Sequence, residues 1–183
     1  MPVSTIDPKA ALVVVDLQKG IARFPTAVPV TQVAGKAGEL ARAFRDRGLP
    51  VILVNVGGIA PGRAEQGFAL DEIPADFLEF LPELGREPGD HVITKQSWGA
   101  FTRTGLEDRL RDAGVTQIVL AGVATSAGVE STARQAHELG FNVTLAIDAM
   151  TDMDAEAHAN SVARIFPRLG ETGSAQDIID LLS

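Results

Sequence analysis

The sequence predicts an α/β fold in which a central, mostly parallel sheet lies between two layers of helices. Two observations carry this prediction. Short apolar runs alternate along the chain with segments of helical periodicity. The apolar runs are nearly continuous instead of alternating with polar residues, which is typical of parallel strands that helices cover on both faces.

Five strands can be placed from the apolar runs. The first, at residues 10–15, is an unbroken apolar run rich in β-branched side chains. Shorter runs of the same kind predict further strands at residues 51–56, 91–94, 117–121 and 143–147. Each run is short enough for a strand and is separated from the next by a helical or glycine-containing segment.

Helices are predicted between the strands. Apolar residues at residues 30–44 follow the spacing of an amphipathic helix, which Gly48 and Pro50 terminate. Similar patterns predict helices at residues 106–113, 129–136 and 162–169. Ser174 begins a last helix, with Asp177 completing an imperfect capping box. The helix after residue 121 is expected to have Thr125 or Ser126 as its N-cap.

Residues 57–89 are the least regular part of the chain and are rich in proline and glycine. We expect a long excursion above the sheet, with a short helix at residues 76–81. Neither a repeat nor a linker divides the chain, so residues 1–183 are expected to form one domain.

Composition excludes several classes of function. The net charge is −8, from 24 acidic and 16 basic residues, which disfavours nucleic acid and anionic membrane as partners. The chain has no cysteine, so disulfides, thiolate metal sites and thiol catalysis are excluded. It shows neither a signal peptide nor an apolar run long enough to span a bilayer, so a cytoplasmic location is expected.

The predicted strand ends bring polar residues to one edge of the sheet. Ligands of parallel α/β sheets bind at the carboxyl ends of the strands. The residues that follow or end the five predicted strands are Asp16, Asn55, Lys95, the segment 122–125 and Asp148. Two opposite charges and a glycine-containing turn are therefore expected at the same edge.

Asp16 and Lys95 are the candidate charged pair. Asp16 follows an apolar strand, so burial favours its protonated form while a nearby Lys95 favours the ionised form. The alternative for Asp16 is a carboxylate that caps a loop or helix, and for Lys95 a solvated surface amine. Lys95 precedes Trp98 and Phe101, which favours a buried position.

Gly128 falls in the first turn of the helix that follows residues 122–125. A glycine inside a helix costs about 1 kcal/mol relative to alanine. It therefore indicates either space for a ligand or close packing against the first strand. The free N–H groups of such a helix start could bind a carboxylate or an oxyanion.

The three histidines do not indicate a metal site. His91, His137 and His158 are far apart in the sequence and lack the spacing of metal ligands. Structural or surface roles are expected for them, and no metal and no cofactor is predicted.

Five segments resemble those of the isochorismatase-like hydrolases, a branch of the cysteine hydrolase superfamily. They are residues 11–18 (ALVVVDLQ), 93–101 (ITKQSWGAF), 120–134 (LAGVATSAGVESTAR) and the tail pieces 148–149 and 165–168. The resemblance covers essentially the whole chain and implies a Rossmann-like α/β/α fold with a six-stranded sheet. It also implies a non-proline cis peptide between Val123 and Ala124, and a homodimer or larger homo-oligomer.

The same resemblance implies roles for three residues. In the thiol members an Asp, a Lys and a Cys form the catalytic triad, and these positions fall on Asp16, Lys95 and Gly128. True isochorismatases also lack the Cys, and there the Asp protonates an enol carbon of a vinyl ether before water attacks. The zinc ligands that nicotinamidases place after the second strand have no counterpart in this sequence.

The sequence therefore predicts a hydrolase that acts on a small molecule without a cysteine nucleophile. Asp16 would be the general acid or base, and Lys95 its electrostatic partner. The substrate, an isochorismate-type vinyl ether or a related small acid, would lie among six residues: Phe24, Trp98, Phe101, Val123, Ala124 and Thr125. The alternative is a catalytically silent protein that has kept the pocket and binds a small molecule.

Overall fold

A computed structural model describes residues 2–65 and 74–182 of the chain. Its centre is a six-stranded sheet in which every neighbouring pair is parallel, in the order β3-β2-β1-β4-β5-β6. The strands are β1 (Ala10–Val15), β2 (Val51–Val56), β3 (His91–Lys95), β4 (Gln117–Val123), β5 (Asn142–Thr151) and β6 (Glu171–Gly173). The predicted α/β fold with a six-stranded sheet is confirmed.

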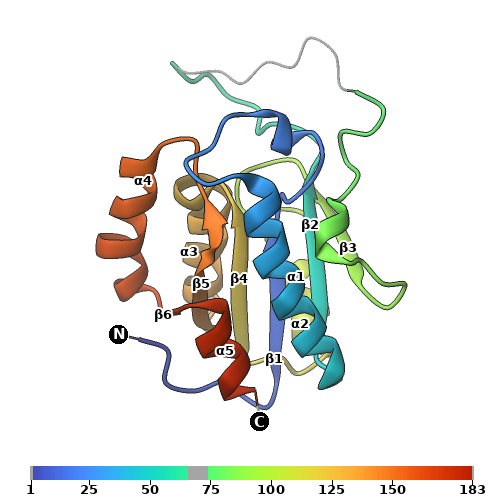
Figure 1. The fold of residues 1–183 in the computed structure, drawn as a ribbon, viewed down its shortest axis with the longest axis vertical. Coiled ribbons are helices and arrows are strands. Elements are labelled where there is room, and N and C mark those ends of the chain that lie inside the picture. The colour runs from blue at the N-terminus through green and yellow to red at the C-terminus, as the bar shows by residue number, and fades with distance from the viewer. Residues whose placement is uncertain (1, 66–73, 183) are drawn as a thin grey trace.

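Helices cover both faces of this sheet (Figure 1). The helices α1 (Val30–Asp46) and α5 (Ala175–Leu181) lie on one face, and α2 (Leu106–Asp112) and α3 (Glu130–Glu138) lie on the other. The helix α4 (Ala155–Asn160) lies beside the sheet, next to a π-helical turn η4 (Ser161–Ile165) and a 3-10 turn η5 (Phe166–Arg168). Further short turns are η1 (Ile21–Arg23), η2 (Pro82–Leu84) and the π-helical turn η3 (Thr125–Val129).

The central strand β1 explains why the sheet is buried on both sides. All six of its residues are buried. Leu12 and Val14 belong to the apolar cluster beneath α1 and α5, whereas Val13 and Val15 belong to the cluster beneath α2 and α3. Since successive side chains of a strand point to opposite faces, a continuous apolar run serves both layers at once.

The strand β5 differs from its prediction. It runs from residue 142 to residue 151, well beyond the predicted end at residue 147. Leu120 pairs with Leu145, but Gly122 pairs with Met150, so β5 carries extra residues at a register shift. Asp148 lies within this irregular stretch, and its Oδ1 accepts the N–H of Ala175 at the start of α5. The prediction that Asp148 ends the strand at the candidate site is therefore wrong.

Two smaller features also differ from prediction. Residues 76–81 form turns and a bridge between Gln18 and Phe80, where a short helix was expected. The three-residue strand β6 has no apolar run that could have revealed it. The backbone of residues 76–81 bonds instead to the segment after β1. For example, the N–H of Lys19 donates to the carbonyl of Glu79.

Candidate active site

Asp16 lies immediately after β1, at the carboxyl edge of the sheet. Its backbone φ is 56°, in the left-handed region that Asp tolerates better than most residues. Its N–H donates to the carbonyl of Val54 in the neighbouring strand β2. The chain therefore turns sharply at Asp16, and the residue keeps a ladder bond that fixes its carboxylate at the strand end.

Lys95 is the last residue of β3, two strands away from β1. Its Nζ lies 2.7 Å from Asp16 Oδ2 and donates to the carbonyl of Ser97 at 3.0 Å. The side chains of Lys95 and Asp16 are only 2% and 8% exposed. The structure thus brings the two predicted charges together as a buried ion pair, and the solvated alternative for Lys95 is excluded.

The Asp16 carboxylate is only half satisfied. Oδ2 faces Lys95, but Oδ1 is buried and has no hydrogen-bond partner among the described residues. Burial raises the pKa of Asp16 to about 6, and the charge and hydrogen bond of Lys95 partly oppose that rise. A buried carboxylate with a raised pKa and a free oxygen can both hold and release a proton near neutral pH.

Gly128 lies in η3, directly beside this pair. A Cβ built on Gly128 would lie 3.2 Å from Asp16 Oδ2, 3.2 Å from Val15 Cγ1 and 3.4 Å from the Val123 carbonyl oxygen. A side chain at residue 128 would therefore begin against the carboxylate. These contacts are tight for a Cβ, so the structure favours the alternative in which Gly128 packs closely against the end of β1.

The backbone before η3 carries two unusual features. The peptide between Val123 and Ala124 is cis, as the resemblance implied. Gly122 has a φ of 133°, and a Cβ there would lie 2.0 Å from the Val15 carbonyl oxygen. Only glycine lets β4 approach β1 this closely at the strand end.

Asp152 is a residue of this region that sequence reasoning missed. It follows β5, is buried, and accepts the N–H of Ser126 through Oδ2 at 2.7 Å. The start of η3 is thus capped by a carboxylate of the chain itself, and neither Thr125 nor Ser126 serves as its side-chain cap. The Ser126 N–H that was expected to help bind a substrate anion is already occupied. The only sequence signal was the apolar pair Ala149 and Met150, which prolongs β5 past Asp148.

Thr125 and His158 form a second contact that the sequence did not reveal. Thr125 is fully buried, and its Oγ1 donates to the Thr151 carbonyl at 3.0 Å. His158 Nδ1 lies 2.8 Å from the same hydroxyl oxygen. The histidine comes from α4, which packs beside η3.

The other residues that were predicted to surround the substrate are spread over several parts of the structure. Val123 is buried, Ala124 is half-buried, and both precede η3 directly. Trp98 is 65% exposed, one residue after the Ser97 carbonyl that binds Lys95. Phe24 is half-buried against the cluster beneath α1. Phe101 packs on Phe141, which precedes β5 at the amino edge of the sheet, with a centroid distance of 6.0 Å. Phe101 is half-buried against the apolar cluster beneath α3, and its place in a pocket wall stays a prediction.

Asn55 at the end of β2 anchors the segment above the sheet. Its Nδ2 donates to the carbonyl of Leu78, while Oδ1 is buried without a partner among the described residues. Buried Gln18 has a similar role, since its side chain bonds Val56 and the Phe77 carbonyl. These amides hold residues 77–81 over the carboxyl edge of the sheet.

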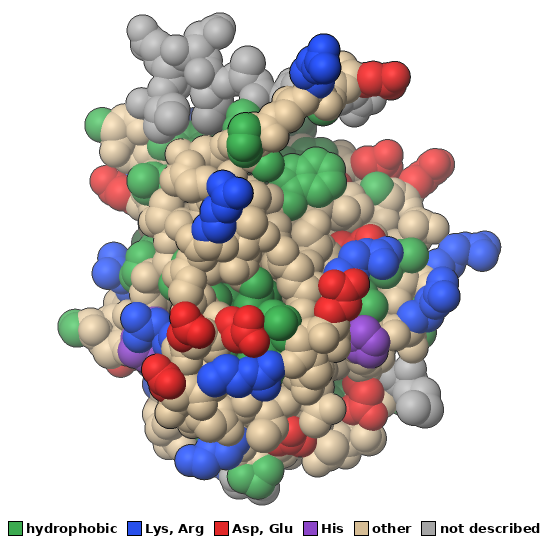
Figure 2. Space-filling view, turned by 180° about the vertical axis from the view of Figure 1, so that it is seen from behind, with side chains coloured by type: hydrophobic (Ala, Val, Ile, Leu, Met, Phe, Trp, Pro, Cys, Tyr) green, Lys and Arg blue, Asp and Glu red, His purple; other side chains and the backbone are tan. Residues whose placement is uncertain are grey.

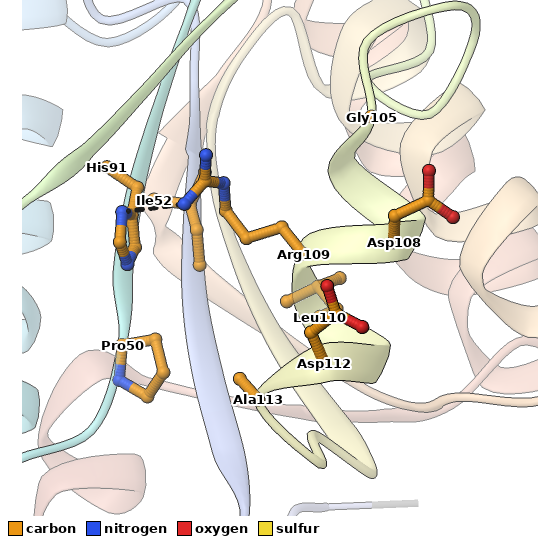
Figure 3. A pocket seen from close by; sticks show the side chains of 9 residues that line it. All are labelled: Pro50, Ile52, His91, Gly105, Asp108, Arg109, Leu110, Asp112 and Ala113. Carbon is orange, nitrogen blue, oxygen red and sulfur yellow. Dashed lines mark hydrogen bonds between the residues drawn. The ribbon is translucent and has the colours of Figure 1, made fainter.

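A cavity of about 490 Å³ lies between the amino ends of β2 and β3 and helix α2, where Arg109 contacts His91 Nδ1 at 3.1 Å (Figure 3). Residues 2–65 and 74–182 contain no group of three His, Asp or Glu side chains that could hold a metal ion. On the face shown in Figure 2, Lys and Arg side chains are interspersed with Asp and Glu. No helix among the described residues is long and apolar enough to cross a membrane.

Comparison with known proteins identifies the family. The isochorismatase domain matches residues 10–177. An uncharacterised isochorismatase family protein of Escherichia coli O157:H7 is 41% identical over 179 residues, which cover 94% of this chain and 95% of the relative. The structure of an isochorismatase family protein from Burkholderia thailandensis superposes with a TM-score of 0.93 at 39% identity, covering 97% of each chain. The maleamate amidohydrolase of Pseudomonas putida is 29% identical over 186 residues, covering 95% of this chain and 87% of that enzyme. The chain belongs to the isochorismatase family of hydrolases.

Proposed function

We propose that the chain hydrolyses a small molecule without a cysteine nucleophile, using Asp16 as general acid or base and Lys95 as its electrostatic partner. The observation that carries the proposal is the free, buried Oδ1 of Asp16, a carboxylate with a pKa of about 6. Gly128 places no side chain against the other oxygen of this carboxylate, Oδ2, which a Cβ at residue 128 would approach to 3.2 Å. In the proposed reaction, a substrate atom or a water molecule reaches Asp16 from the side where the thiol members of the family carry the cysteine.

The proposed chemistry divides the work between the two oxygens of Asp16. Lys95 holds Oδ2 and stabilises the carboxylate that remains after the carboxyl group has given up its proton. Oδ1 carries the proton that is transferred. For a vinyl ether, that proton would go to the enol carbon, and the ether oxygen would stabilise the resulting cation. Water would then add to the cationic carbon and return a proton to Asp16, and the hemiketal so formed would break its C–O ether bond to release a ketone and an alcohol. An isochorismate-type vinyl ether or a related small acid is the substrate class that suits this step.

A catalytically silent binding protein is the second candidate, and the missing thiol favours it. The half-satisfied ion pair favours the enzyme. A buried pair contributes little net stability, and leaving one buried acceptor unpaired costs about 1–3 kcal/mol. A pocket kept only for binding has no need of a carboxylate that is poised to exchange its proton.

A substrate panel separates the two candidates. Isochorismate, ureido acids and small amides are incubated with the wild-type chain and with Asp16→Asn, and both products and binding are measured. We expect turnover of at least one compound and a loss of about 10²–10⁴-fold in Asp16→Asn, with the fold retained. Binding without product would favour the silent protein, and an Asn variant with near-normal kcat would refute the role of Asp16.

The position of Gly128 can be tested without a substrate. The chain has no cysteine, so in Gly128→Cys any alkylation reports this residue alone. We expect the introduced thiol to titrate about 1–5 units below the free value, because it stands near Lys95 in the first turn of a helix and Asp16 can accept its proton. Iodoacetamide labelling from about pH 5 to about pH 9 measures this shift, with Gln176→Cys on the exposed face of α5 as control. Equal apparent pKa values for the two thiols would show that Gly128 does not occupy a nucleophile position.

A further inference from the structure

The helix α4 reaches the candidate site through one side chain. None of its residues, Ala155–Asn160, is buried, so apolar packing does not hold the helix in place. Its His158 nevertheless contacts the fully buried hydroxyl of Thr125. One residue beyond the helix, Ser161 donates to Glu130 Oε2 at 2.6 Å at the start of α3. Two polar contacts therefore hold this segment against the end of β4 and the helix that follows it.

The direction of the His158 contact follows from the hydroxyl. Thr125 has one hydroxyl proton, and it is donated to the Thr151 carbonyl, which can only accept. The Thr125 oxygen must then accept from His158, so His158 Nδ1 carries a proton. His158 is therefore the donor in this contact.

The Thr125 hydroxyl joins three elements at one point. It belongs to the first residue of η3, it bonds the last residue of β5, and it receives the bond from α4. The next residue, Ser126, is bonded to Asp152, which also follows β5. Gly128 lies two residues further along the same turn, against Asp16 Oδ2. The position of Gly128 relative to Asp16 thus depends on how the first residues of η3 are fixed.

We propose that His158 is a positioning residue for the Asp16–Lys95 site, because it fixes the Thr125 hydroxyl and thereby the turn that carries Gly128. The inference rests on the proposed function, because the position of the turn matters to activity only if Asp16 and Lys95 form the active site. The hydrogen bond from His158 to Thr125 does not depend on that function. His158 does not contact Asp16 in this arrangement, so its effect on the site is transmitted through the backbone of η3.

The test compares two replacements of His158. Asn places an amide N–H near the position of Nδ1, whereas Phe keeps a ring of similar shape and has no donor. His137→Phe is the matched control, because His137 contacts the Leu169 carbonyl through Nδ1 and lies on α3 away from η3. Amide hydrogen exchange of residues 125–129 is measured in each single variant, and the thiol pH profile is measured with each change combined with Gly128→Cys.

We expect His158→Phe to speed exchange in residues 125–129 and to slow alkylation of the introduced thiol at neutral pH by about three- to tenfold, the range that one lost hydrogen bond can produce. His158→Asn should restore both properties, and His137→Phe should change neither. If Asn and Phe have equal effects, or if Phe has none, the positioning role is overturned. If the thiol of Gly128→Cys without a second change has the pKa of a free cysteine, the proposed active site is refuted. The hydrogen-exchange data then still decide whether His158 fixes the turn.

Discussion

Two ion pairs at opposite edges of the sheet show how a structural pair differs from a candidate catalytic one. At the amino edge, Arg45 of α1 binds Asp90 through two bonds of 2.9 and 2.7 Å, and Asp90 Oδ2 also accepts the N–H of Glu87. At the carboxyl edge, Lys95 binds only one oxygen of Asp16. Both carboxylates are buried, with side-chain exposures of 2% for Asp90 and 8% for Asp16.

The difference lies in how completely each carboxylate is satisfied. Bidentate guanidinium bonds with an added backbone donor fix the Asp90 charge and its geometry. A single ammonium contact leaves Asp16 with an unpaired oxygen and a pKa raised by burial to about 6. The fully bonded pair joins the C-terminus of α1 to the start of β3, whereas the half-bonded pair leaves Asp16 Oδ1 without a hydrogen bond among the described residues. Three predictions test this contrast.

Lys95→Met should raise the pKa of Asp16 further, because the ammonium is the group that opposes the effect of burial. Loss of a close opposite charge moves a carboxyl pKa by about 1–3 units. Titration of the Asp16 carboxyl carbon by NMR in wild type and variant measures the shift. An unchanged or lowered pKa would show that Lys95 does not control this proton.

The stability of the fold should depend on pH through Asp16. Its folded pKa of about 6 lies above the usual 3.8, so the folded state binds more protons than the unfolded state between these values. The free energy of unfolding should therefore fall as the pH rises from about 4 to about 6. The contribution, about 3 kcal/mol for a shift of about two units, is lost above that range.

Urea denaturation at about pH 4 and about pH 7 measures this effect as the difference between wild type and Asp16→Asn. Glu171 and Asp177 have pKa values lowered by hydrogen bonds from Ser4 and Ser174, and they contribute the opposite slope in both proteins. The variant should therefore lose less stability, or gain more, on going to pH 7. Parallel pH dependence in the two proteins would contradict the raised pKa.

Asp90→Ala should destabilise the fold by about 1–3 kcal/mol at neutral pH, because it removes the carboxylate that accepts from Arg45 and from the Glu87 N–H. Arg45 cannot escape by losing its proton, since a guanidinium stays charged at neutral pH. When Asp90→Ala is combined with Gly128→Cys, the reactivity of the introduced thiol should stay unchanged, because the Arg45–Asp90 pair lies at the amino edge of the sheet. A variant with normal stability but an altered thiol profile would reverse the assignment of the two pairs.

The sequence predicted the pair at the carboxyl edge because strand ends are easy to locate. The strands β1 and β3 are flanked by polar residues, and parallel strands bring their ends to one edge. Asp16 and Lys95 therefore met as expected. The sequence could not predict how many hydrogen bonds each carboxylate accepts, since that number depends on side-chain directions across three strands.

The part of the carboxyl edge that β4 and β5 form was harder to predict. A register shift between β4 and β5 displaced the strand end from Asp148 to Thr151, and periodicity does not reveal such a shift. Asp152 and His158 were consequently missed, because their partners Ser126 and Thr125 lie in another segment of the chain. The neighbours of Phe101 were hard to predict for a related reason: its position after Lys95 did not show that its ring packs against Phe141.

The two glycines beside Asp16 differ in what they permit over evolutionary time. Gly122 is locked by its backbone, since any Cβ there would meet the Val15 carbonyl oxygen at 2.0 Å. Gly128 carries no such restriction, because a Cβ would need its neighbours to give way by only a few tenths of an ångström. In the genetic code, two of the glycine codons become cysteine codons by a single base change. Where one of those two codons encodes Gly128, a single base change would therefore place a thiol against the buried Asp16–Lys95 pair.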